Sequence, residues 1–190
     1  MLKVLRPAVC LLALMTFVLG LAYPAFIAGV ARVGFPLRAA GSLVERDGQV
    51  VGSRLIGQSF STPAYFWGRP SATIPYPYDA LASTGSNFGP LNPALLERVG
   101  VVEAAFDEAS GEPHGGIPVD LVTVSASGLD PDITPAGARF QARRVARARG
   151  IGLSRIEAAI AAHTQGALLG FIGEPRVNVL EVNLALDAMR

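Results

Sequence analysis

Residues 125–150, SASGLDPDITPAGARFQARRVARARG, combine several side chains that could carry out chemistry. Two serine hydroxyls, a glycine and an aspartate come first, and a run of arginines follows them. Three kinds of structure use such residues. They are a catalytic serine loop, a loop that holds a phosphate group, and a turn that leads into a helix. The spacing of the residues has to distinguish these three.

Turn chemistry accounts for most of the polar residues in this segment. Gly128 permits a positive φ, and Asp130 and Thr134 each precede a proline that favours extended backbone. Asp130 is suited to an Asx turn, and Thr134 to capping a helix with Pro135 at its first position. Neither serine stands in the G-x-S-x-G pattern of a serine hydrolase. The segment therefore favours a corner that leads into a helix.

The arginines of the predicted helix leave two interpretations open. Arg139, Arg143 and Arg147 recur every four residues, so they share one face of the helix. Such a face is either solvated or a surface on which a partner docks.

The composition excludes several kinds of catalytic or binding site. Lys3 is the only lysine, which removes the P-loop lysine and any Schiff-base lysine. Cys10 is the only cysteine, and His114 and His163 stand apart without metal-ligand spacing around them. The net charge of +1 indicates no field that would attract nucleic acid. We expect no catalytic residue, no metal and no directly bound cofactor.

The N-terminal region predicts a membrane span over residues 8–31. These 24 residues carry no charge, and at about 1.5 Å per residue they reach roughly 36 Å as a helix. A cleaved signal peptide ending near the small residues 20–22 is the alternative. Positive charge at the N-terminus slightly favours a cytoplasmic N-terminus. We therefore expect a cytoplasmic stretch at 1–7, a transmembrane helix at 8–31 and an extracytoplasmic domain at 32–190.

Turn and cap signals mark the first elements of that domain. Asp47 and Gly48 form a two-residue turn signal between strand-like runs, which predicts a β-hairpin. Asn92 precedes a proline and an apolar stripe that ends at Gly111, which predicts a core-facing helix.

Three further elements complete an α+β fold. The apolar, β-branched run 119–126 predicts a buried strand. Ser154 and Glu157 suggest a capping box for a helix that ends near Gly166. Residues 176–186 form either a last strand or a strand that turns into a terminal helix.

The region 56–92 has no sustained periodicity and is rich in proline and aromatic residues. Loops of this length are uncommon in compact domains unless they bind something. Its aromatic residues either complete the core or form a partner surface. The docking candidates, together with the three helix arginines, are Gln58, Tyr65, Phe66, Trp67, Arg69, Ser86 and Asn87. We expect Trp67 and Arg69 to contribute to docking more than to folding.

Four segments in order resemble one family over nearly the whole chain. They are GQSFSTPAYFWGRPSA, STGSNFGPLNP, VDLVTVSASGLDPDITPAGARFQARRVARARG and GEPRVNVLEVNLALD. Together they resemble the KdpC family, the C subunit of the bacterial Kdp potassium-transporting ATPase. The resemblance implies a single-pass protein of the bacterial inner (plasma) membrane. It also implies a complex with a potassium-channel-like subunit, KdpA, and a P-type ATPase subunit, KdpB.

The resemblance implies a non-catalytic subunit that stabilises the complex and influences ion access, while the complex handles ATP and potassium. The chain itself has no TVGYG-like filter and no DKTGT phosphorylation motif. In this family the stretch corresponding to Ser125, Ser127, Gly128 and Asp130 has been likened to a nucleotide-clasping signature, with the subunit acting as a catalytic chaperone for ATP binding. This chain departs from that pattern, because Ala126 replaces a glycine and Asp132 a histidine. A third possibility is an independent membrane-anchored binding or hydrolytic domain.

Overall fold

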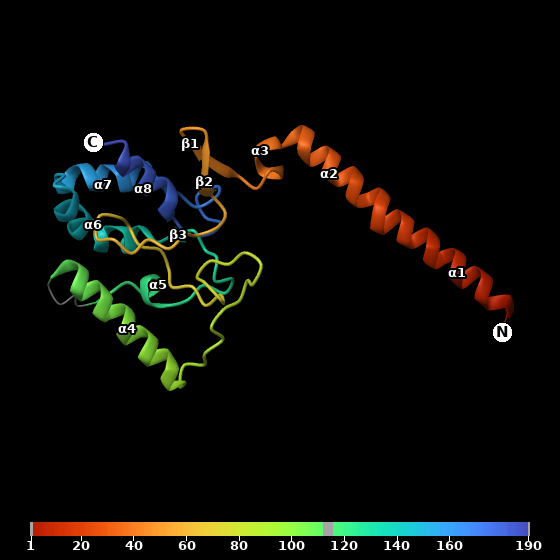
Figure 1. The fold of residues 1–190 in the computed structure, drawn as a ribbon, viewed down its shortest axis with the longest axis horizontal. Coiled ribbons are helices and arrows are strands. Elements are labelled where there is room, and N and C mark those ends of the chain that lie inside the picture. Colours follow the sequence, from red (N-terminus) through yellow and green to blue (C-terminus); the bar gives the residue numbers. More distant parts are fainter. Residues whose placement is uncertain (1, 112–115, 190) are drawn as a thin grey trace. The chain divides into compact units, whose positions relative to one another are not determined.

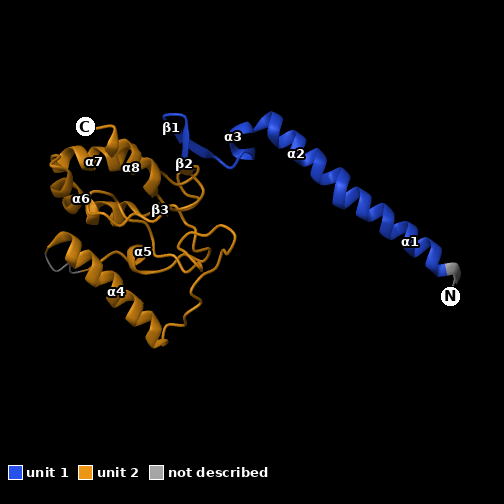
Figure 2. Cartoon of the chain, in the orientation of Figure 1, with its two compact units in different colours: residues 1–51 blue, residues 52–190 orange. Residues whose placement is uncertain are grey.

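The computed structural model describes residues 2–111 and 116–189, so His114 lies outside the described residues. The chain divides into two compact units, Met1–Val51 and Gly52–Arg190 (Figure 2). Each unit is described by itself.

Unit 1 begins with a long apolar helix. It consists of α1 (Leu2–Phe17), the π-helical turn η1 (Val18–Ala22) and α2 (Tyr23–Gly34). The π turn lies directly before Pro24, which has no N–H to donate, and the Tyr23 N–H bonds to the Val18 carbonyl. The stretch Val4–Gly34 is long and apolar enough to cross a membrane, and it contains the predicted span 8–31.

The rest of unit 1 contains the short helix α3 (Pro36–Ala39) and the hairpin strands β1 (Leu43–Arg46) and β2 (Gln49–Ser53). The last two residues of β2 belong to unit 2. Asp47 and Gly48 have φ values of 52° and 77° at the centre of the turn. Two positive φ values in succession are what a type I′ hairpin turn requires, so the predicted hairpin is confirmed.

Unit 2 combines helices with a small antiparallel sheet (Figure 1). The helices are α4 (Pro93–Ser110), α5 (Val119–Val122), α6 (Pro135–Arg149), α7 (Leu153–Ala162) and α8 (Val179–Asp187). The strands β3 (Asp132–Ile133), β4 (Thr164–Gln165) and β5 (Arg176–Asn178) have the order β3-β5-β4. This mixture of helix and strand agrees with the α+β class expected from the sequence.

The hydrophobic core of unit 2 forms around α6. In Figure 1, α6 lies between α4 and the pair α7 and α8. Phe106 of α4 meets Phe140 of α6 edge to face, with ring centroids 5.6 Å apart. The largest fully buried apolar side chains are those of Phe66, Leu121, Ile133, Val145, Ile156, Ile160, Val177, Val182 and Leu186.

Cap residues set the helix boundaries where the sequence places them. The Asn92 side chain accepts a hydrogen bond from the Ala94 N–H at the start of α4, and Gly111 ends that helix with φ 73°. Thr134 accepts from the Gly137 N–H at 2.9 Å, which fixes the start of α6. Asn178 caps α8 directly after β5, so of the two alternatives for residues 176–186 the strand followed by a helix is confirmed.

The predicted buried strand at 119–126 is wrong in its backbone and right only in part in its burial, because Val119 is 70% exposed. Residues Val119–Val122 form the one-turn helix α5, and Leu121 is fully buried. The turn directs the Asp120 carboxylate inward, where it accepts the Thr134 N–H at 2.7 Å. Periodicity alone cannot separate a buried strand from a helical turn in so short an apolar run.

The predicted capping box in α7 is also wrong. The helix begins at Leu153 after Gly152, so Ser154 is already the second helical residue. The helix ends at Ala162 rather than near Gly166, because Thr164 pairs with Val177 in the sheet. A contact distant in sequence therefore decides this boundary.

Two side-chain amides hold the long loop between β2 and α4. The amide of Asn183 accepts the Phe66 N–H at 2.8 Å and donates to the Phe66 carbonyl at 3.0 Å. The amide of Gln141 does the same for Trp67, at 2.7 and 3.0 Å. Both amide side chains are buried. Each amide thus supplies the pair of hydrogen bonds that a neighbouring strand would otherwise provide. We call these two contacts the amide clamps.

We predict that Asn183→Leu lowers the free energy of unfolding. It leaves the Phe66 N–H and carbonyl without their amide partner, at a cost of about 1–3 kcal/mol for each buried group. Urea unfolding of the full-length chain in detergent, followed by the fluorescence of its single tryptophan, would measure this loss. Glu103→Leu places a leucine at an exposed helical position of α4 and serves as the control. Equal stability of the two variants would contradict the clamp.

Candidate functional site

The serines of the segment 125–131 stabilise its own turn. The Ser125 hydroxyl accepts the Gly128 N–H at 3.0 Å, and the Ser127 hydroxyl accepts the Leu129 N–H at 3.1 Å. Gly128 has φ 68°, a conformation that favours glycine. The expected corner before α6 is therefore confirmed, and we refer to residues 125–131 as the corner.

The long loop covers the corner through backbone contacts. The Thr84 N–H donates to the Ser127 carbonyl at 3.0 Å, and the Ser71 hydroxyl donates to the Gly128 carbonyl at 2.7 Å. A Cβ atom at Gly128 would lie 2.5 Å from the Thr84 carbonyl oxygen. The chain's own backbone therefore fills the space beside this glycine that a bound phosphate group would need.

Asp130 and Arg69 join the corner to the long loop. One carboxylate oxygen of Asp130 accepts the Asp132 N–H at 3.0 Å, which forms the expected Asx turn. The other oxygen pairs with the Arg69 guanidinium at 3.0 Å. Arg69 also donates to the Thr123 and Val124 carbonyls, at 3.5 and 3.4 Å. The charge of Arg69 is thus used within the fold.

Tyr78 packs behind this ion pair. Its hydroxyl donates to the Arg69 carbonyl at 2.5 Å. Burial, with a smaller contribution from the Asp130 charge, raises the pKa of Tyr78 to about 12. The hydroxyl therefore stays protonated and keeps donating throughout the physiological pH range.

The aromatic docking candidates divide between the core and its edge. Phe66 is fully buried, so the structure corrects its assignment to a partner surface. Trp67 packs on Phe106 with ring centroids 4.9 Å apart, and its indole N–H donates to the Thr62 carbonyl at 2.9 Å. The Tyr65 hydroxyl donates to Asp187 at 3.1 Å. These contacts give Trp67, like Arg69, a role in the fold, and docking by either side chain stays a prediction.

Two arginines that sequence reasoning passed over hold the same loop. Arg144 is buried, lies 4.3 Å from the centroid of the Trp67 ring, and donates to the Pro63 carbonyl at 2.7 Å. Burial lowers the pKa of Arg144 to about 10, so the guanidinium remains charged at neutral pH. The available signal was the position of Arg144 beside Val145 on the apolar stripe of α6.

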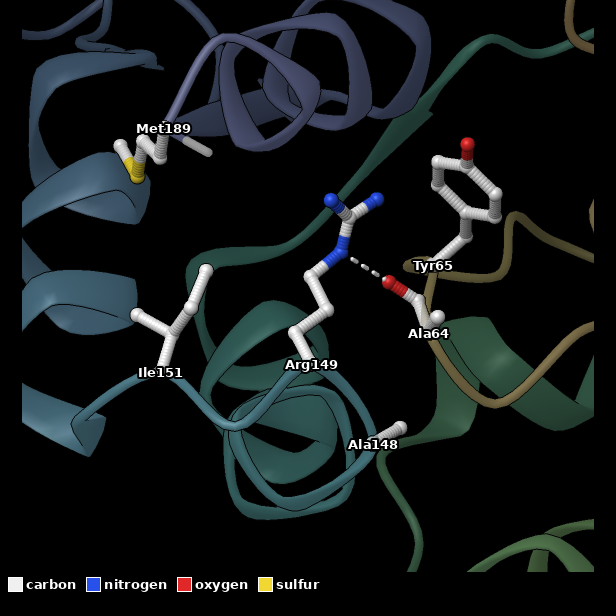
Figure 3. Close-up of a pocket in the computed structure, with 6 residues that line it drawn as sticks. All are labelled: Ala64, Tyr65, Ala148, Arg149, Ile151 and Met189. Carbon is white, nitrogen blue, oxygen red and sulfur yellow. Dashed lines mark hydrogen bonds between the residues drawn. The ribbon is translucent and has the colours of Figure 1, made fainter.

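Arg149 is the second of these arginines, and it lines a pocket between the end of α6 and the long loop. Figure 3 shows its side chain directed toward Ala64, whose carbonyl accepts from Nε at 2.6 Å. Its Nη2 pairs with Asp187 at 2.9 Å. Ile151 and Met189 give the pocket an apolar side. The polar groups of this pocket are satisfied by one another.

The remaining docking candidates lie on or near the surface. Arg139 and Arg143 are exposed, while Arg147, also exposed, donates to the Ser110 carbonyl at 2.7 Å. Asn87 is exposed with φ 53°. Gln58 and Ser86 are half-buried. Within residues 2–111 and 116–189, the structure has no group of three or more histidine, cysteine, aspartate or glutamate side chains that could hold a metal ion.

These features define an α+β domain that follows an apolar helix and uses its chemically capable side chains to stabilise its own loops. Residues 5–188 match the family model described as "K+-transporting ATPase, c chain", KdpC. The chain belongs to this family.

Three relatives illustrate the similarity, and each is described as a potassium-transporting ATPase KdpC subunit. The protein from Variovorax paradoxus is 57% identical over 186 residues, covering 98% of this chain and 96% of the relative. The protein from Sorangium cellulosum is 56% identical over 190 residues, covering 100% of both chains. The protein from Burkholderia vietnamiensis is 55% identical over 184 residues, covering 97% and 95%.

We predict that Asp130→Ala destabilises unit 2 by about 1–2 kcal/mol, because it removes both the Asx turn and the partner of Arg69. Asp130→Asn is the matched control, since its amide oxygen can still accept the Asp132 N–H. Urea unfolding of the full-length variants should rank their stabilities as wild type, Asp130→Asn, Asp130→Ala. A stability of Asp130→Ala equal to that of the wild type would show that the corner does not depend on this carboxylate.

Proposed function

We propose that this chain is a non-catalytic accessory subunit of a bacterial potassium-transporting ATPase. In this role it stabilises the complex of a potassium-channel-like subunit, KdpA, with a P-type ATPase subunit, KdpB, and influences ion access to it. The observation that carries the proposal is the match to the c-chain family over residues 5–188. The relatives named above share the full length of the chain as well as its separate motifs.

The chemistry of the described residues supports a subunit that acts through its partners. One apolar helix cannot enclose a pore by itself. The hydroxyls of Ser125 and Ser127 are engaged in the turn, and Asp130 is paired with Arg69. We therefore assign the catalytic work to the ATPase subunit.

A role as a nucleotide-binding chaperone receives less support from this chain. The stretch Ser125, Ser127, Gly128 and Asp130 forms the corner, and the long loop fills the space beside Gly128. Ala126 and Asp132 are the departures from the family pattern. Asp132 pairs with Arg176 at 3.0 Å and with Asn178 at 3.0 Å, so it serves the sheet.

The proposed topology follows from the apolar helix and its flanking charges. Residues 1–7 would lie in the cytoplasm, residues 8–31 would cross the inner membrane, and residues 32–190 would lie outside the cytoplasm. A domain that follows a single span is translocated largely regardless of its own charge. This placement would also separate the corner from cytoplasmic ATP.

We predict that the affinity-tagged chain, expressed with the KdpA and KdpB subunits of its own organism, copurifies with both in mild detergent. A tagged single-span protein of unrelated sequence is the control. Recovery of the chain without either subunit would overturn the proposed function.

In the purified complex, Ser127→Ala should leave the KM for ATP unchanged. A tenfold higher KM would favour the nucleotide-binding alternative instead.

The proposed topology predicts that a cysteine at an exposed site of unit 2 reacts with an impermeant maleimide in intact spheroplasts. Leu81 is 95% exposed, so the Leu81→Cys variant in a Cys10→Ala background is suitable. Labelling only after lysis would reverse the topology. Sequencing the N-terminus of the mature protein is the second measurement, because a chain that begins at Tyr23 would show that the helix is a cleaved signal.

A further inference from the structure

The segment between β4 and β5 forms an apolar finger, which we define as residues 166–175. Leu168 and Ile172 pair across it, with N–H to carbonyl distances of 2.8 and 2.9 Å. The exposed fractions are 67% for Leu168, 76% for Leu169, 77% for Phe171 and 49% for Ile172. Residues 164–173 contain no charged residue. Four large apolar side chains thus project together from an ordered loop.

Folding does not explain the apolar character of this finger. Leu169 has φ 55°, a conformation that glycine or asparagine adopts far more readily than leucine. Its side chain is largely exposed, so packing against the described part of the chain does not offset the strain. An unfavourable backbone conformation that no packing within the fold offsets indicates that the Leu169 side chain makes a contact outside this chain's fold.

Part of the backbone of the finger is hydrogen-bonded within the finger itself. The N–H groups of Gly170 and Phe171 donate to the carbonyls of Ala167 and Leu168, at 3.0 and 3.3 Å. Together with the reciprocal pair between Leu168 and Ile172, these bonds use the N–H groups of residues 168 and 170–172 within the finger. An apolar medium requires this arrangement, because it offers no partner for a free N–H.

The finger lies beside the point where the chain enters unit 2. Gln165 and Arg176 pair at its base. The same two residues line a pocket with Arg54 and Leu55, and Asn178 donates to the Arg54 carbonyl at 3.0 Å. The residues at the start of unit 2 therefore contact the base of the finger. The tether that leads back to the apolar helix leaves the unit at this end.

We propose that the apolar finger inserts its tip into the outer surface of the lipid bilayer beside the anchoring helix. This inference rests on the proposed function, in which residues 8–31 span the membrane. Residues 35–51 tether unit 2 to that helix and extend at most roughly 60 Å. The tether therefore keeps the finger at a high effective concentration near the bilayer surface.

Lipid suits the finger better than a protein partner does. A specific protein interface carries about one hydrogen bond per 100–200 Å², yet the side chains of residues 166–173 offer no hydrogen-bonding group. Lipid requires apolar side chains, and the internal hydrogen bonds of residues 168 and 170–172 lower the cost of burying the backbone there. At the base of the finger, Arg54 and Arg176 are more than half exposed, although each pairs with an acidic side chain. Insertion of the tip would bring these two arginines toward the lipid headgroups.

The test uses the full-length chain without partner subunits, in nanodiscs of phosphatidylethanolamine and phosphatidylglycerol. In a Cys10→Ala background, a spin label is attached in turn to Phe171→Cys, Leu81→Cys and Leu14→Cys. Leu81 is the exposed reference in unit 2, and Leu14 reports on the apolar helix. Collisions with oxygen and with a water-soluble nickel complex measure the surroundings of each label. The label at position 171 should resemble the one at 14, with high oxygen accessibility and loss of nickel accessibility.

Each other outcome overturns the finger proposal in a recognisable way. Nickel accessibility at position 171 equal to that at 81, with position 14 protected, would show that the finger stays in water although the helix is inserted. Nickel accessibility at both 171 and 14 would overturn the membrane anchor as well. Protection of position 171 from both reagents would indicate a protein contact, such as one with a second copy of the chain.

Leu169→Asn supplies a variant that keeps the fold. Asparagine tolerates the positive φ, so the melting temperature of the chain in detergent should stay the same or rise. The added polar side chain should restore nickel accessibility to a label at position 171. A melting temperature that falls steeply would show that Leu169 supports the fold, which would overturn the argument from its exposure.

Discussion

The fold of unit 2 depends on hydrogen bonds to the backbone of the long loop, which has no neighbouring strand to supply them. Phe66 carries its main chain into the core, where an unpaired N–H or carbonyl costs about 1–3 kcal/mol. Asn183 meets this requirement from α8, and Gln141 meets it for Trp67 from α6. The loop thereby joins two helices that are distant in sequence. The corner before α6 in turn rests on this loop through Thr84 and Ser71.

The arginines of α6 divide according to the side of the helix on which they lie. Arg144 and Arg149 face the loop and bind its carbonyl groups, while Arg139 and Arg143 face solvent. The carbonyl groups of this loop are well matched by guanidinium groups, which present several donors in one plane. Residues that look chemically active in the sequence thus become structural once folded. This use of the side chains is consistent with the accessory role proposed above.

Local signals in the sequence predicted the parts of the fold that depend on the residues themselves. The turn at Asp47 and Gly48 and the caps at Asn92 and Thr134 follow from conformational preferences that act over a few residues. The predictions for the run 119–126 and for the end of α7 were wrong, because contacts distant in sequence decide the structure there. These contacts are Asp120 with Thr134 and Thr164 with Val177. The site was the least predictable part. No local pattern pairs Asn183 with Phe66 or Arg69 with Asp130, and the docking role proposed for the exposed positions remains a prediction.

The amide clamps also determine how freely this loop can change its sequence. Asn183 and Gln141 bind the peptide groups of residues 66 and 67. Every residue except proline, which lacks the N–H, would supply these peptide groups in the same form. The route of the main chain is therefore largely independent of the side chains that decorate it on the solvent side. Substitutions can accumulate at such outward positions while the main chain beneath them keeps its course. A surface of this kind can change in sequence without the chain first losing the ability to fold.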